Sequence, residues 1–287
     1  MSLATGAGTV RPRRPGPAAG VLRRSRTALF YLPAVLVFVS AIVLWELIVT
    51  ALDLRAFVLP KPSAIASAFG QHFDSGDPRF VILPAARATI YEALGGLVIG
   101  TTAGLVVAFA TARWATARDV LLPLAVAANA IPIIAFSPLL NAWFGLANPL
   151  SKMMMAAVLV FFPVMANVTR GLVQVDASAI ELMRSMAASE WTILRKVRIP
   201  NALPYFFTAM KLATTLSLIG AIVAEYFGSG NRVLGRLIVD SASALRFDIT
   251  WAAILVGAAA GIVFYLVVVV LERVFIPWHS SVRSGEP

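Results

Sequence analysis

The 287-residue chain contains no cysteine and only two histidines, His72 and His279. Without cysteine it can form neither a disulfide nor a thiolate metal or redox site. The sequence also lacks an HExxH pattern and a paired-carboxylate constellation, so hydrolytic chemistry has no candidate residues. No glycine is followed by lysine, which excludes the phosphate-binding pattern GxxxxGK[ST]. We therefore expect a chain that is not an enzyme, does not hydrolyse ATP and binds no cofactor or metal ion.

Charged residues are also scarce: they make up 13% of the chain, whereas 59% of the residues are hydrophobic. A soluble domain carries about 25% charged residues, so we expect most of this chain to lie in a lipid bilayer. The formal net charge is +10, but the lysines and arginines fall between apolar runs instead of gathering on one folded face. This pattern favours membrane topology over nucleic-acid binding.

Six apolar runs are long enough, at about 20 residues, to cross a bilayer as helices. They cover residues 29–51, 88–112, 121–143, 150–170, 205–227 and 251–276. The first run exceeds a signal-peptide core and has no small-residue cleavage site, so we expect it to remain as a span. The sequence thus predicts an all-α integral membrane protein with six transmembrane helices, in which residues 29–276 form the membrane domain.

Polar segments flank and connect these runs. Residues 1–28 are rich in Gly, Pro, Arg and Ser and are predicted to be a disordered basic arm, with residues 277–287 as a tail. Lysine and arginine are more frequent on one side, which favours a cell-membrane protein with both termini and the loop 171–204 in the cytoplasm. On the other side, Lys61 and Pro62 are expected to start a short helix, and residues 228–231 a turn before an amphipathic stretch.

Residues 178–200, with the sequence SAIELMRSMAASEWTILRKVRIP, form a charged island. Ser178 followed by Glu181 is a capping-box pattern, which predicts a helix start. Ser189 is expected to cap a second helix, and Pro200 to end it. An apolar stripe at helical spacing consists of Ile180, Met183, Ala187 and Trp191. Because such a stripe has little reason to face water, we expect a docking element instead of an inert loop.

The same segment resembles the coupling motif of ABC-importer permeases, which reads Glu-Ala-Ala, three residues, Gly, and a hydrophobic stretch ending in Leu-Pro or Ile-Pro. Glu181 stands at the Glu position and Ile199-Pro200 at the end. Two segments are similar to the nitrate/sulfonate/taurine branch of this family, most of all to its pyrimidine, thiamine-precursor and riboflavin uptake members. Their sequences are AASEWTILRKVRIPNALPYFFTAMKLA and IGAIVAEYFGS. Leu182-Met183 replaces Ala-Ala, and Ala187 replaces Gly. Because alanine is the better helix former, a shallower bend is expected there.

This resemblance implies the type I ABC-importer permease fold, with a coupling-helix loop between the fourth and fifth spans. It also implies a second permease copy, two ATPase subunits that use ATP, an extracytoplasmic solute-binding protein, and alternating access. The residues that it assigns to ATPase coupling are Glu181, Met183, Arg184, Ala187 and Trp191. The substrate is expected to be a thiamine-precursor pyrimidine or a related heterocycle, with an alkanesulfonate, taurine or nitrate as the alternative. A stand-alone secondary carrier would show a buried acid or base relay or an inverted repeat, and neither is visible in the sequence.

Few polar side chains fall inside the apolar runs. Such groups either line a solute path or form hydrogen bonds between helices, and the sequence leaves both uses open. The candidates for the translocation path are Asn129, Ser137, Asn141, Asn167, Thr214, Thr215 and Ser217. The third run also contains Pro123, Pro132 and Pro138, which predict a kinked or broken helix.

Small and charged residues mark two more runs. Gly96, Gly100 and Gly104 form a GxxxGxxxG ladder, which packs either within one chain or against a second copy. Lys211 and Glu225 lie in the fifth run, and intramembrane charges are functional candidates. Both are nevertheless close enough to a helix end to extend to the membrane surface, which is the blander interpretation.

Overall fold

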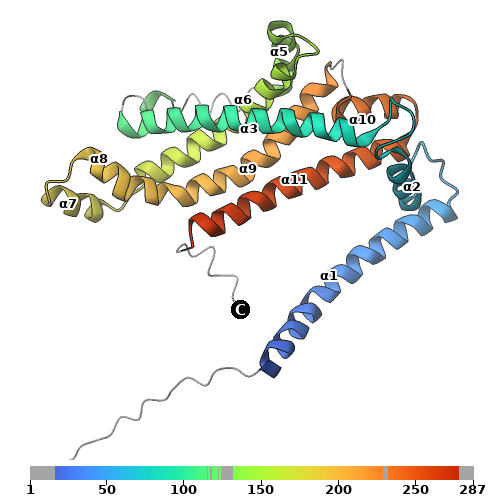
Figure 1. Ribbon diagram of the computed structural model, residues 1–287, viewed down its shortest axis with the longest axis horizontal. Helices are drawn as coiled ribbons and strands as arrows, with labels where there is room; N and C mark the ends of the chain where they lie inside the picture. The colour runs from blue at the N-terminus through green and yellow to red at the C-terminus, as the bar shows by residue number, and fades with distance from the viewer. Residues whose placement is uncertain are drawn as a thin grey trace, which may run out of the picture. The chain divides into compact units, whose positions relative to one another are not determined.

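The computed structural model describes residues 17–114, 116, 118–121, 123, 132–228 and 232–277. The regular elements among them are all helical (Figure 1), which confirms the predicted all-α class. The chain divides into two units, Met1–Arg55 and Ala56–Pro287. Five helices in the described part are long and apolar enough to cross a membrane, and they coincide with five of the six predicted runs.

The first unit holds one long helix, α1 (Pro17–Ala51). It begins inside the region expected to be a disordered arm, and proline suits a first helical turn because its missing N–H would be unpaired there anyway. The span candidate Leu32–Ala51 exposes apolar side chains along its length, including Leu36, Phe38 and Leu47. A helix that is apolar all round requires lipid or protein around it, as expected for a first span.

The second unit is built on four long helices. They are α3 (Ile82–Arg113), α6 (Pro149–Val173), α9 (Ile199–Tyr226) and α11 (Phe247–Phe275). Three short helices accompany them: α2 (Pro62–His72), α5 (Phe136–Phe144) and α10 (Leu234–Ser243). The predicted short helix after Lys61 is therefore confirmed as α2, and the predicted amphipathic stretch as α10.

The predicted third span, residues 121–143, lies partly outside the described residues, which omit 122 and 124–131. After Pro132 the chain forms a 3-10 turn, η1 (Ile133–Ala135), and then α5. The Ala135 N–H donates to the Pro132 carbonyl at 2.9 Å, so a new turn starts directly after this proline. Because α5 is too short to cross a bilayer, the described residues account for five spans.

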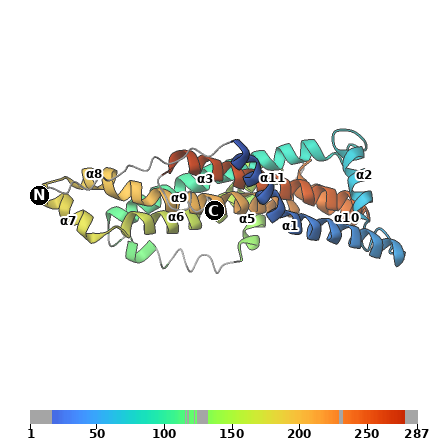
Figure 2. The same cartoon turned by 90° about the horizontal axis from the view of Figure 1, so that it is seen from below.

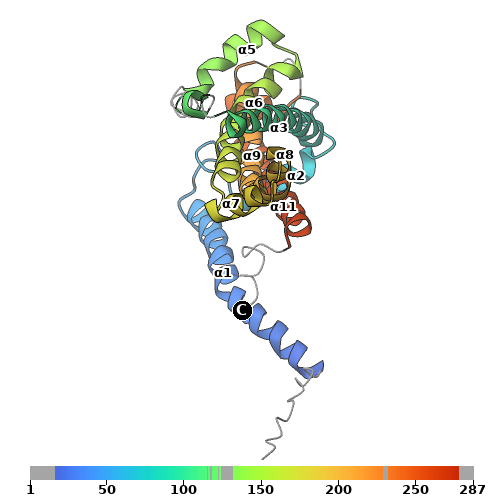
Figure 3. The ribbon, with the colours of Figure 1, turned by 90° about the vertical axis from the view of Figure 1, so that its left-hand side faces the viewer.

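α6 packs against both α3 and α9 (Figure 3). Glycine makes the α3–α6 contact possible, because the two backbones touch. A Cβ on Gly96 would lie 2.4 Å from the Cβ of Ala156, and one on Gly100 would lie 2.4 Å from the Ala157 carbonyl oxygen. The glycine ladder therefore packs within the chain, as one of the two interpretations held, and its use against a second copy is wrong.

The second unit has two opposite ends (Figures 1 and 2). One carries α7 (Ala177–Ser185) and α8 (Glu190–Ile193), and we call it the α7–α8 end. The other carries α2 and α10, and we call it the α10 end. Within the described part of the chain, the helices α3, α6, α9 and α11 run between these two ends and connect them.

The connection from α8 into α9 is one helical stretch. A π-helical turn, η2 (Leu194–Arg198), joins them, and the Ile199 N–H bonds the Leu194 carbonyl five residues back. Pro200 lies in the first turn of α9, so the prediction that it ends a helix is wrong. Proline has no N–H and its ring clashes with the carbonyl four residues back, and the wider π turn accommodates both effects.

Candidate functional site

The helices at the α7–α8 end begin with side-chain caps. The Asp176 carboxylate accepts a hydrogen bond from the Ser178 N–H at 3.0 Å, so Asp176 caps α7 and the predicted capping role of Ser178 is wrong. Ser189 caps α8 as predicted, since its hydroxyl accepts from the Thr192 N–H at 3.3 Å. Both caps satisfy N–H groups that a helix start leaves without a partner.

α7 ends at a sharp reversal centred on Ala187. This residue has φ +54°, in the left-handed region, while the Ala187 N–H bonds the Arg184 carbonyl and the Ala188 N–H bonds the Met183 carbonyl. This pair of bonds is the Schellman ending, whose left-handed position usually holds glycine. The chain therefore reverses fully at Ala187, and the prediction of a shallower bend is wrong. Alanine pays a steric cost at this φ, because its Cβ approaches the following carbonyl oxygen.

The α7–α8 end presents large apolar side chains to the surroundings. Leu182, Met186 and Trp191 are 62%, 71% and 68% exposed. Met183, which the sequence placed on the exposed stripe, is half-buried. Arg184 forms a 3.4 Å ion pair with Glu190 that links α7 to α8, and Glu181 is exposed beside Leu182. Four of the five predicted coupling residues thus lie on an open surface, and Leu182 and Met186 were missed.

A hollow of about 340 Å³ lies where α8 and η2 meet the last turn of α3. Its apolar lining includes Phe109, Trp191 and Leu194, and its charged lining consists of Arg113, Arg198 and Glu190. The Arg198 guanidinium donates to the Ala112 carbonyl at 3.4 Å. The surface at this end therefore combines an apolar depression with charged groups, two basic and one acidic.

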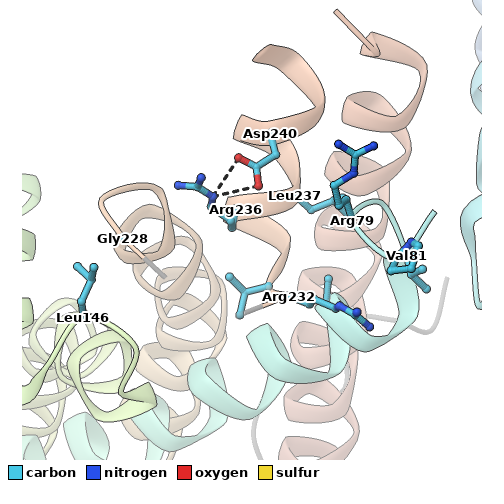
Figure 4. A pocket seen from close by; sticks show the side chains of 11 residues that line it. Arg79, Val81, Leu146, Gly228, Arg232, Arg236, Leu237 and Asp240 are labelled. Carbon is cyan, nitrogen blue, oxygen red and sulfur yellow. Dashed lines mark hydrogen bonds and ion pairs between the residues drawn. The ribbon is translucent and has the colours of Figure 1, made fainter. Parts of the chain in front are cut away.

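A second hollow, of about 460 Å³, lies at the α10 end (Figure 4). Arg79, Arg232 and Arg236 line it, against the single acid Asp240. Arg236 pairs with Asp240 at 3.0 Å, one turn further along α10. Outside the lining, Asp77 pairs with Arg79 at 2.7 Å, and the hydrogen bond from Arg79 lowers the pKa of this carboxyl to about 2. The hollow therefore keeps a positive charge.

Three ionisable side chains are buried near the α10 end, one from each of three packed helices. Glu92 of α3, Lys152 of α6 and Glu225 of α9 are 4%, 1% and 0% exposed. The interpretation that Glu225 extends to the membrane surface is therefore wrong, and Lys152, near the start of the predicted span 150–170, is also buried. Intramembrane charge was the signal for all three, but their meeting depends on helix packing.

Hydrogen bonds connect this buried cluster to the adjoining short segments. Glu225 Oε2 accepts from the Gly235 N–H at 2.5 Å, and Thr89 Oγ1 accepts from the Leu234 N–H at 2.9 Å, so α3 and α9 both hold the start of α10. On the other side, Lys152 Nζ donates to the Leu146 carbonyl and to the Asn141 side-chain oxygen, the latter at 3.5 Å. The cluster therefore joins α10 and the end of α5 to the helix core.

The predicted path residues are not brought together. Ser137 and Asn141 are buried on α5, and Asn141 touches Lys152. Three others donate to carbonyls of their own helix: Asn167, Thr214 and Ser217. Thr215 is exposed and lines an apolar groove of about 450 Å³ between α9 and α11. Asn129 lies outside the described residues.

Lys211 has a partner inside the bundle. Its ammonium pairs with the carboxylate of Glu272 on α11 at 2.5 Å, and the Glu272 side chain is only 9% exposed. The Lys211 side chain is itself 24% exposed, so the pair is only partly shielded, and the interpretation that Lys211 extends to the membrane surface stays a prediction. This pair is one lysine against one glutamate, unlike the buried cluster, which holds two glutamates and one lysine.

The family described as binding-protein-dependent transport system inner membrane component matches residues 96–280. The chain is 30% identical to the riboflavin transport system permease protein of Chloroflexus aurantiacus, over 93% of this chain and 97% of the relative. It is 28% identical to the formylaminopyrimidine transport permease protein of Halalkalibacterium halodurans, over 86% and 95%. It is also 29% identical to a putative aliphatic sulfonates transport permease protein of Bacillus subtilis, over 87% of each.

Proposed function

Because the chain belongs to the family of binding-protein-dependent transport system inner membrane components, which makes it a permease component of an ABC importer, we propose that it forms half of the substrate path. A second copy supplies the other half. In this family ATP is hydrolysed by separate subunits, which fits a sequence without a phosphate-binding loop. The path then opens alternately to the two sides of the membrane as the ATPase subunits close and separate.

The observation that carries this proposal is the exposed apolar surface of Leu182, Met186 and Trp191 at the α7–α8 end. Exposed aromatic and long apolar side chains rimmed by charges mark a protein interface. We assign this surface to the ATPase subunit, with Glu181 and Arg184 setting the orientation. Trp191 lies on the helical stretch that continues through η2 into α9, so movement of the docked ATPase is transmitted directly to a membrane helix.

The same assignment gives the orientation. The α7–α8 end faces the cytoplasm, with both chain termini on that side, and the α10 end faces outward. Lysine and arginine favour the cytoplasmic side, and η2 alone contributes Arg195, Lys196 and Arg198. The outward hollow with its excess of arginine is then the surface to which the solute-binding protein presents acidic side chains.

The proposed substrate is a small heterocycle such as a thiamine-precursor pyrimidine. Support comes from the relatives named for riboflavin and formylaminopyrimidine transport, both matched over nearly their full length. The relative named for aliphatic sulfonates keeps a sulfonate as the alternative. Asn141 at the buried cluster, Ser137 on the same helix and Thr215 in the α9–α11 groove are the path candidates that do not bond only to their own helix.

The test is co-purification of the tagged chain from its own cell in mild detergent, followed by mass spectrometry. An ABC ATPase is expected with the wild type and is lost in Trp191→Ala. Trp143→Ala is the matched control, because Trp143 is equally exposed, at 67%, but lies on α5. Uptake that continues without ATP, with no ATPase in the preparation, would refute the proposal and favour a stand-alone carrier.

A further inference from the structure

The buried cluster of Glu92, Lys152 and Glu225 does not balance in charge if every group is ionised. Two carboxylates and one ammonium leave one negative charge in a bundle where the three side chains are at most 4% exposed. Burying an uncompensated charge costs several kcal/mol even after relaxation. A neutral cluster needs one additional positive charge, and the described residues around it supply no second cation.

The two carboxyl groups also lie within hydrogen-bonding reach of each other. Neither can donate when both are ionised, because a carboxylate is an acceptor only. One oxygen on each, Oε2 of Glu92 and Oε1 of Glu225, is buried and has no donor among the described residues. Unsatisfied buried acceptors are rare because they lose their hydration without compensation. A proton shared by the two carboxyls removes the excess charge and gives one of them an O–H group that can donate to the other.

We propose that Glu92 and Glu225 bind one proton between them, and that the resulting neutral cluster with Lys152 fixes α10 and the end of α5 to the helix core. The hydrogen bonds from Gly235 and from Lys152 to the Leu146 carbonyl carry the fixation. The three cluster residues are positioning residues, because they act on the outward hollow through α10. Arg236 and Asp240 of α10 line that hollow. The role of that hollow rests on the proposed function, whereas the shared proton does not.

A close backbone approach supports the same role. A Cβ on Gly235 would lie 2.5 Å from the Ile222 carbonyl and 2.7 Å from the Glu225 Cβ. Only glycine allows the start of α10 to approach α9 so closely that its amide reaches the buried carboxyl. The contact is therefore a fixed joint, and a change in the charge of the cluster acts directly on α10.

The test uses the full chain in lipid nanodiscs, with thermal unfolding and infrared spectroscopy as readouts. In Glu92→Gln and in Glu225→Gln a neutral amide replaces the acid that shares the proton, so each melting temperature stays within about 2 °C of wild type. The double variant E92Q/E225Q leaves Lys152 alone and melts at least about 5 °C lower. Adding Lys152→Met to the double variant restores the melting temperature.

The matched control is Glu272→Gln, which leaves Lys211 without its single partner and is expected to melt lower, unlike either single variant of the cluster. In the infrared spectrum, the wild type shows a protonated-carboxyl C=O band at neutral pH that both single variants lose. Absence of this band, or single variants as unstable as the double variant, would overturn the proposal. Neither readout depends on transport, so a failed importer assignment would leave this result standing.

Discussion

The side-chain amide of Asn201 donates a 2.7 Å hydrogen bond to the carbonyl oxygen of Gly171, and a second of 3.0 Å to the carbonyl of Gln174. It thereby fastens the first turn of α9 to the last turn of α6, and everything between them, including α7 and α8, forms a closed loop. A force on α7 or α8 consequently reaches both long helices at once.

Asn201→Ala should uncouple ATP hydrolysis from transport. Two carbonyls lose their donor, which costs about 1–3 kcal/mol where the groups are partly buried, and the loop gains freedom to move without α6. We expect the ATPase still to co-purify while substrate uptake per ATP falls several-fold in proteoliposomes. Asn167→Ala is the control, since Asn167 bonds only within α6. An unchanged amount of substrate taken up per ATP in Asn201→Ala would show that the two hydrogen bonds from Asn201 have no mechanical role.

Glu181→Lys should abolish transport while the chain still inserts in the membrane. The side chain is exposed on α7, so reversal costs little folding free energy, and its expected effect is like-charge repulsion or a lost pairing at the ATPase surface. The measurement is uptake, together with the amount of membrane-inserted chain. Normal uptake in this variant would contradict the coupling role assigned to Glu181.

Ala187→Gly should stabilise the α7 reversal. The left-handed φ of +54° costs alanine about 1 kcal/mol and glycine very little. Slower amide hydrogen exchange over residues 177–193 is the expected sign, with Ala188→Gly as the matched control. Faster exchange in Ala187→Gly than in wild type would mean that the reversal is not held as described.

Gly100→Ala should destabilise the bundle by about 1–3 kcal/mol, because the added methyl meets the Ala157 carbonyl oxygen at 2.4 Å and the backbones must separate. Gly261→Ala is the control: its methyl would meet the Leu218 side chain at 3.4 Å, an ordinary contact. The melting temperatures of the two variants in nanodiscs make the comparison. Equal melting temperatures would contradict backbone contact between α3 and α6.

Reversal of the charge at Arg232 should weaken capture of the solute-binding protein. Arg232 lines the hollow at the α10 end, and among the described residues no ion pair involves it that the substitution would break. We expect Arg232→Glu to slow association several-fold at low salt and less at high salt, because salt screens exposed charges. Surface plasmon resonance against the reconstituted permease gives the rate. Arg55→Glu, from the first unit, tests whether any lost positive charge has the same effect.

Local patterns predicted the helices well and their meeting points poorly. Apolar runs gave five spans, and the Ser189 cap and the helix after Lys61 followed from short-range backbone chemistry. The sequence did not reveal that Glu92, Lys152 and Glu225 share one buried site, because they lie on three helices whose rotation is set by packing. The predictions for Pro200 and Ala187 were wrong for a related reason. At Pro200 propensity indicated a helix end, but the structure has a π turn that continues the helix. At Ala187 propensity indicated a shallow bend, but the structure has a left-handed residue and a full reversal.

The exposed surface at the α7–α8 end, which we propose for ATPase docking, shows the same difference between what local pattern and packing determine. Helical spacing placed Trp191 and the charged residues correctly on an exposed segment, but it could not show which face of α7 turns inward. Met183 is half-buried and its neighbours Leu182 and Met186 are exposed. That choice depends on the direction of the reversal at Ala187, which only the assembled structure fixes.

The glycine contacts between α3 and α6 limit which parts of the bundle can change position during a transport cycle. Two helices whose backbones touch cannot slide past each other without atomic overlap. Gly220 of α9 also lies against α6, since an added Cβ there would be 2.7 Å from the Ala156 Cα. We therefore expect α3, α6 and α9 to move as one rigid body. The α9–α11 boundary is different, because Gly257 and Gly261 there leave ordinary clearance beside an open groove. Backbone overlap therefore does not block movement between α9 and α11 at these two glycines, so what resists it there is side-chain contact, including the Lys211–Glu272 pair.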